Sequence, residues 1–88
     1  MTVEQFPLIF ERGCGIDVHK DSAVATIKGV DLEEQTRTFS TFTEHIYELV
    51  GWLQIHNVTH VAMESTGVYW KPVYYILEEF FEVILVNA

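Results

Sequence analysis

Polar and apolar residues alternate from about residue 11 to residue 20. Cys14, Ile16 and Val18 occupy every second position, and Asp17 lies between the last two. Because successive side chains of a strand point to opposite faces, this alternation predicts a β-strand. We expect the strand to be buried, and a carboxylate within a buried strand is costly unless it is paired or binds a metal ion. Asp17 therefore requires a chemical explanation.

Two more strands are predicted to follow the first. Asp21 and Ser22 have turn chemistry, so residues 23–28 form a second strand one tight hairpin away and antiparallel to the first. Residues 31–34 are acidic and predict a solvated connection. The threonine-rich segment Gln35–Ser40 predicts a third strand, which completes a meander.

A helix is predicted after the meander. Thr41 to Glu44 has the form of a capping box, in which Thr41 caps the helix and Glu44 reaches back to the Thr41 backbone. Apolar residues then recur at helical spacing, at Ile46, Leu49, Val50 and Leu53. The helix is expected to end near His56 and Asn57, because Asn tolerates the left-handed conformation found at helix ends.

The second half of the chain predicts a strand, a helix and a final strand. The strand covers residues 58–64, and the helical spacing reappears at Val73, Ile76, Leu77 and Phe80. Residues 81–86 are nearly all apolar, which favours a buried strand. The order is therefore β-β-β-α-β-α-β, an α/β chain whose last two strands are returned parallel by helical crossovers. Residues 1–10 show no clear period and form a lead-in to one domain over residues 11–88.

Composition limits what this domain does. A hydrophobic fraction of 49% in 88 residues indicates one small globular unit. A formal net charge of −8 argues against nucleic-acid binding, unless some acids bind metal or the chain belongs to a larger, more basic protein. The single Cys14 favours a buried thiol in a reducing cytoplasm, and no run of 18 apolar residues predicts a membrane span.

Asp17 and Glu64 are the candidate metal ligands. Glu64 ends the apolar run that begins at residue 58, so the two carboxylates meet if their strands are parallel neighbours. Hard oxygen ligands of this kind suit magnesium or manganese (Mg²⁺ or Mn²⁺). Two alternatives stay open. Asp17 pairs with Lys20 or a backbone N–H, and Glu64 only caps the following helix.

Residues near the two carboxylates are candidates for contacts with nucleic acid. Thr66 lies in a loop before a helix, where free N–H groups meet phosphate. Tyr69, Lys71 and Lys20 supply an aromatic surface and two cations, although Tyr69 also fits a core position. His19 is a weaker candidate ligand. The remaining histidines have no partners in the sequence and are predicted to be non-functional: His45, His56 and His60.

Four segments resemble a known family. They are Gly15-Ile16-Asp17-Val18-His19-Lys20, Trp52-Leu53, Met63-Glu64-Ser65-Thr66-Gly67-Val68-Tyr69-Trp70 and Val83-Ile84-Leu85-Val86-Asn87. Together they resemble the N-terminal DEDD domain of bacterial insertion-sequence transposases of the IS-one-ten group, the bridge-RNA-guided recombinases. The resemblance covers roughly residues 13–88. The strand that carries Asp17 and the strand end that carries Glu64 are specific to the family only in combination.

The resemblance implies a ribonuclease-H-like (RuvC-like) mixed sheet that stops after its fifth strand. Asp17 and Glu64 then correspond to the first two acidic residues of the family's metal-binding tetrad. The other two, and a C-terminal domain with a serine proposed to attack DNA, are expected beyond Ala88. DNA, a guide RNA and further copies of the protein are the implied partners, at the nucleoid in the bacterial cytoplasm. We expect a transposase fragment that catalyses no strand transfer alone.

Two other functions fit the same element order. An actin-like or sugar-kinase-like ATPase also begins with a Gly-Ile-Asp strand, but it usually places glycine and a small hydroxyl residue directly after the Asp. Val18, His19 and Lys20 occupy that turn here and hinder close backbone approach to a phosphate. A non-catalytic assembly module is the second alternative, because the apolar final strand offers an edge for pairing with a partner.

Overall fold

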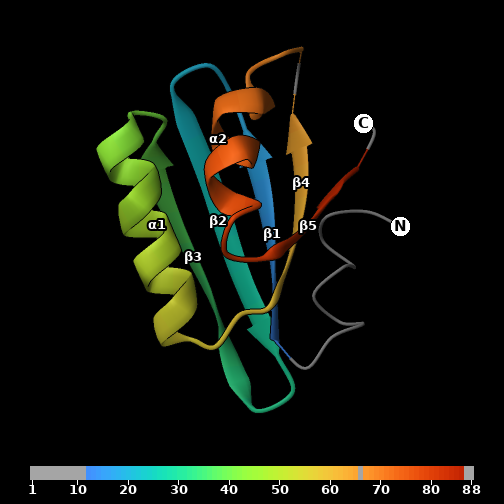
Figure 1. Ribbon diagram of the computed structural model, residues 1–88. Helices are drawn as coiled ribbons and strands as arrows, with labels where there is room; N and C mark the ends of the chain where they lie inside the picture. The colour runs from blue at the N-terminus through green and yellow to red at the C-terminus, as the bar shows by residue number, and fades with distance from the viewer. Residues whose placement is uncertain (1–11, 66, 87–88) are drawn as a thin grey trace.

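Five strands form one mixed sheet in the spatial order β3-β2-β1-β4-β5 (Figure 1). The computed structural model describes residues 12–65 and 67–86, so the lead-in predicted for residues 1–10 lies outside the described residues. The elements in chain order are β1 (Arg12–Val18), β2 (Ser22–Gly29), β3 (Leu32–Ser40), α1 (Thr43–Ile55), β4 (His60–Ser65), α2 (Trp70–Leu77) and β5 (Glu82–Leu85). This order confirms the predicted α/β class and its β-β-β-α-β-α-β pattern.

The first strand lies at the centre of the sheet. β1 pairs antiparallel with β2 on one side and parallel with β4 on the other. β3 continues the antiparallel meander, and β5 adds a second parallel pair beside β4. The helical crossovers therefore return parallel strands, as predicted.

The hydrophobic core lies between the sheet and the two helices, which both cover the same face (Figure 1). β1 contributes Cys14, Ile16 and Val18, all fully buried, which confirms the alternation in the sequence. α1 adds the side chains of Ile46, Leu49, Val50, Trp52 and Leu53. No helix within residues 12–65 and 67–86 is long and apolar enough to cross a membrane.

The end of α1 follows the prediction and its beginning does not. Asn57 has a φ of 57°, and the N–H of Val58 donates to the Leu53 carbonyl at 3.0 Å, as in a Schellman motif. At the other end the capping box is wrong, because Phe42 is the N-cap residue and no side chain caps it. The Thr41 hydroxyl instead donates to the Lys20 carbonyl at 3.0 Å, which joins this corner to the β1–β2 turn.

Two strands differ from their predicted limits or environment. β3 begins at Leu32, because pairing with β2 carries the acidic segment predicted as a loop into the ladder, with an irregularity between Ile27 and Gly29. β5 is not a buried strand. It lies at the edge of the sheet, where Ile84 and Leu85 are 39% and 43% exposed.

Trp52 anchors α1 to β3. Its ring centroid lies 5.7 Å from that of Phe39, and the Arg37 guanidinium lies 5.4 Å from the Trp52 ring centroid. His56 adds polar contacts: its Nδ1 donates to the Trp52 carbonyl at 2.9 Å, so its Nε2 is free to accept from Gln35 at 3.2 Å.

Histidines predicted to be without partners therefore have them. His56 fastens the helix end to the sheet, as the preceding contacts show. His45 hydrogen-bonds the Ser40 hydroxyl, and His60 Nδ1 lies 2.7 Å from the Thr59 hydroxyl. These contacts are structural, so the prediction that the three residues have no catalytic or ligand role is not altered.

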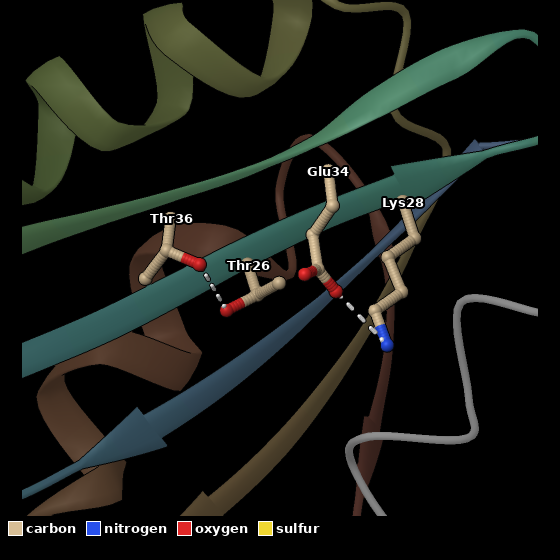
Figure 2. Close-up of polar contacts among 4 residues, drawn as sticks. All are labelled: Thr26, Lys28, Glu34 and Thr36. Carbon is tan, nitrogen blue, oxygen red and sulfur yellow. Dashed lines mark hydrogen bonds and ion pairs between the residues drawn. The ribbon is translucent and has the colours of Figure 1, made fainter.

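The face of the sheet opposite the helices carries polar side chains on β2 and β3. Figure 2 shows Thr26 and Thr36 hydrogen-bonded through their hydroxyls at 3.0 Å, next to the ion pair between Lys28 and Glu34, also at 3.0 Å. Thr26 and Lys28 alternate along β2 with core residues such as Ile27. Asp17 lies on this same face, because it alternates with the core residues of β1.

Candidate metal site at the ends of two parallel strands

Asp17 and Glu64 are direct register partners on β1 and β4. Neighbouring strands are about 4.8 Å apart, and partners at the same register project to the same face of a sheet. Both residues lie next to the carboxyl ends of their strands, and in Figure 1 the two arrowheads point to the same edge. The structure therefore brings together the two carboxylates that the sequence separates.

The environment of Asp17 differs from the one predicted. Its strand is buried on the helix face, but Asp17 itself is exposed on the opposite face and Glu64 is half-buried. The cost of burying a charge is thus largely avoided, because water reaches the Asp17 carboxylate. The premise of a buried Asp17 is wrong, while the prediction that Glu64 is its neighbour is correct.

Neither carboxylate is paired within the part of the chain that the structure describes. The ion pair found there joins Lys28 to Glu34, so Lys20 does not neutralise Asp17. Glu64 does not cap α2 either, since the N-cap position is occupied by Tyr69 and no side-chain cap hydrogen bond is formed there. Among the described residues, the structure therefore shows neither a paired Asp17 nor a helix-capping Glu64.

The strands beside the carboxylates add no further oxygen ligand. Asp17 is paired on its other side with Val24 of β2. On the β5 side, the Val86 N–H donates to the Met63 carbonyl at 2.8 Å, which places an apolar residue next to Glu64. Among residues 12–65 and 67–86 no group of three His, Cys, Asp or Glu side chains is placed to hold a metal ion. The pair fits part of a divalent-cation site, with further ligands supplied by water, substrate or other residues.

The loop after β4 turns sharply at Gly67, whose φ of 65° favours glycine. Thr66, a predicted contact residue, lies outside the described residues. Tyr69 is 43% exposed before α2, which excludes it from the core, and Lys71 is exposed in the first turn. The Lys71 ammonium lies 5.9 Å from the Trp70 ring centroid.

The five cationic side chains of the chain are used in two ways. Three of them are engaged along the sheet: Arg12 donates to the His56 carbonyl at 2.9 Å, Lys28 pairs with Glu34, and Arg37 stacks on aromatic rings. Lys20 and Lys71 lie beyond the carboxyl ends of β1 and β4, at the edge that carries the two carboxylates. The sequence identified Lys20 and Lys71 as candidate contacts. It did not predict that the other three cations lie along the sheet, because that depends on strand pairing.

Solved structures share the fold of this chain at low sequence identity. The Fowlpox virus resolvase in complex with Holliday junction DNA superposes with a TM-score of 0.61 and 17% identity, covering 86% of this chain and 60% of that one. A Bacteroides thetaiotaomicron protein with an actin-like ATPase fold gives a TM-score of 0.60 at 16% identity, with 96% and 37% covered. An exopolyphosphatase from Cytophaga hutchinsonii gives 0.54 at 12%, with 86% and 34% covered.

These likenesses establish a fold common to resolvases and actin-like proteins. They do not distinguish a resolvase activity from an ATPase activity. The chain spans less than two thirds of the length of each of these structures. A comparison with curated proteins found no match. The sequence itself is more informative, because a transposase family model of the DEDD type matches residues 14–88. The chain therefore belongs to the DEDD transposase family of the IS-one-ten group.

Proposed function

We propose that this chain forms part of the catalytic domain of a DNA transposase, in which Asp17 and Glu64 bind a divalent metal ion, Mg²⁺ or Mn²⁺. The observation that carries the proposal is the register pairing of two carboxylates on parallel strands, neither of which forms an ion pair with the described residues. Two adjacent negative charges repel one another, and a divalent cation relieves that repulsion. Family membership supplies the reaction class, phosphodiester strand transfer.

The carboxylates hold the ion, and the ion when bound would stabilise charge on the attacking and leaving oxygens. Rigid strands fix the direction of both side chains, which a metal site requires. Because Asp17 is exposed, DNA is able to approach the site from the face opposite the helices. Lys20 and Lys71 would contact phosphates at the same edge, with Tyr69 available for stacking on a base, and Thr66 would complete this contact set.

We infer the other catalytic residues and the partners of the protein from its family membership. Family membership leads us to expect further catalytic residues in the complete metal site, besides Asp17 and Glu64. DNA is the substrate, and a guide RNA and further copies of the protein are the expected partners. The 88-residue chain supplies two of the carboxylate ligands, Asp17 and Glu64. By itself it is expected to bind the ion weakly and to show no strand-cleaving turnover.

The metal site is tested directly by Mn²⁺ titration of the ¹⁵N-labelled 88-residue chain. The paramagnetic ion should broaden amide signals around residues 15–18 and 62–65 first. Asp17→Asn or Glu64→Gln should remove this selective broadening, whereas Glu48→Gln, an exposed carboxylate on α1, should leave it unchanged. Selective broadening elsewhere, or broadening that survives both substitutions, would contradict the site.

Activity is measured in the longer protein that contains this domain. Substitutions in the shell behind metal ligands typically cost about 10–100-fold, so loss of a ligand should reduce Mg²⁺-dependent recombination by at least about 100-fold. Asp17→Asn and Glu64→Gln should both show this loss with unchanged circular dichroism. Wild-type rates in either variant would refute the catalytic assignment, even if metal binding by the isolated chain were observed.

A further inference from the structure

The outer surface of α1 carries large apolar side chains that face solvent. Tyr47 is 48% exposed and Ile55 is 78% exposed. They lie eight positions apart, with Gly51 midway, and residues spaced by four positions follow one side of a helix. We call Tyr47, Gly51 and Ile55 the α1 outer stripe. It lies away from the buried residues of the same helix, so it takes no part in the core.

Among the described residues, no contact requires glycine at position 51. Glycine in a helix interior costs about 1 kcal/mol relative to alanine. A Cβ built at Gly51 meets nothing within 4 Å, so alanine or a larger side chain would fit without a clash. What glycine provides here is half-buried helix backbone without a side chain, between the exposed Tyr47 and Ile55, which permits another chain to approach closely.

An aromatic pair borders the stripe at the junction of the two helical segments. Phe80, which follows α2, packs edge-on against Tyr47 with centroids 6.4 Å apart and an interplanar angle of 88°. Phe80 is itself 43% exposed. The pair is thus held in place by its own contact while leaving apolar area free, as is typical of an interaction surface.

The charges around the stripe are negative. Glu44 and Glu48 are exposed on α1, and α1 contains no Lys or Arg. Glu78 and Glu79 are exposed just before Phe80. A phosphate backbone would be repelled from this surface. A second copy docked through the same surface would bring Glu44 and Glu48 against their own equivalents, which is unfavourable as well.

We propose that the α1 outer stripe, with Phe80, is a docking site for a basic amphipathic helix of a protein partner. The apolar side of that helix would contact Tyr47, Phe80 and Ile55 and approach the backbone at Gly51. Its Lys or Arg side chains would lie beside Glu44 and Glu48. This site is on the helical layer, whereas the carboxylates Asp17 and Glu64 are on the opposite face of the sheet, so both sites can be occupied together.

The test uses two designed 18-residue helical peptides with the same leucine stripe, one with lysine and one with glutamate on its polar face. Titrated into the ¹⁵N-labelled 88-residue chain, the lysine peptide should shift the amides of Tyr47, Gly51 and Ile55, and the glutamate peptide should not. Gly51→Gln should raise the melting temperature because the helix gains a better helix former, yet weaken lysine-peptide affinity at least tenfold. Tyr47→Ala should also weaken it, while Tyr75→Ala, which removes a more exposed aromatic outside the surface, should not.

Several results would overturn the proposal. Absence of shifts, equal binding of both peptides, or full affinity in Gly51→Gln would each exclude this surface as the site. If a duplex DNA oligonucleotide shifted the stripe amides, the occupant would be DNA. If the chain self-associated with rising concentration and Gly51→Gln abolished this, the occupant would be a second copy. Because Gly51→Gln strengthens the helix, loss of binding in that variant is not a consequence of unfolding.

Discussion

Asn57 shows how one residue determines where a helix ends. With a φ of 57° it allows the chain to leave α1 and start toward β4, while Val58 is buried and closes the motif. We expect Asn57→Ala to lower the free energy of unfolding by up to about 1 kcal/mol, because the short polar side chain of Asn hydrogen-bonds locally in the left-handed conformation and the methyl group of Ala does not. Asn57→Gly should stay near wild type. Urea unfolding measures both, and an alanine variant as stable as wild type would contradict this reading.

Cys14 is the second residue whose behaviour follows from its position. Burial raises the pKa of its thiol well above the ordinary value of 9.0. The thiolate is the reactive form, so the folded protein should not react with a disulfide reagent at pH 8, and the denatured protein should expose one reactive thiol. Rapid labelling under native conditions would show that the central strand opens.

The same pKa shift predicts a pH dependence of stability. Above pH 9.0 the unfolded chain releases the Cys14 proton and the folded chain keeps it, so the stabilisation present at lower pH is lost as the pH rises. The decline approaches about 1.4 kcal/mol per pH unit for one proton. Denaturation curves from pH 8 to pH 11 should show it, and Cys14→Ala should have a shallower slope than wild type. Equal slopes would rule out the thiol as the cause.

At the scale of elements, an aromatic cluster joins α1 to β3. Trp52 is 8% exposed and lies between Phe39 and His56, with Arg37 stacked on it. The periodicity of α1 predicted its apolar face but not that a cation and an imidazole complete the packing. Those partners come from a strand and a helix end, whose proximity is a property of the folded chain.

Removing the Trp52 ring should loosen α1 from the sheet. We expect Trp52→Ala to lower the free energy of unfolding by about 3–5 kcal/mol, since it deletes a large buried aromatic and leaves a cavity. Gln54→Ala, an exposed position on the same helix, should change it by less than about 0.5 kcal/mol. Similar losses in both variants, measured by chemical denaturation, would contradict an anchoring role for Trp52.

On the scale of the whole molecule, the net charge of −8 limits the affinity that this chain can have for DNA. Lys28, Arg37 and Arg12 contact groups along the sheet, whereas Lys20 and Lys71, the latter over the Trp70 ring, lie at the edge that bears Asp17 and Glu64. Two cations beside two carboxylates attract phosphate weakly until a divalent ion is bound. Metal binding and DNA binding should therefore be coupled.

Without metal, the 88-residue chain should not bind duplex DNA measurably. In EDTA at about 0.15 M salt we expect a Kd weaker than about 10⁻⁴ M, the weak limit of non-specific binding. Fluorescence anisotropy with a labelled duplex measures it, and Mg²⁺ should increase the affinity in wild type more than in Glu64→Gln. Tight binding in EDTA that falls steeply with salt would reveal a cationic surface that the described residues do not show.

The sequence by itself determined the order of the elements, the core face of β1 and the end of α1, because period-two alternation and the tolerance of Asn for positive φ are local properties. It also identified Asp17 and Glu64. Only the tertiary structure decided that they share one register, that Asp17 is exposed and that β5 lies at an edge. Strand neighbours and register depend on the packing of the entire sheet, so the placement of the two carboxylates side by side is a property of the fold.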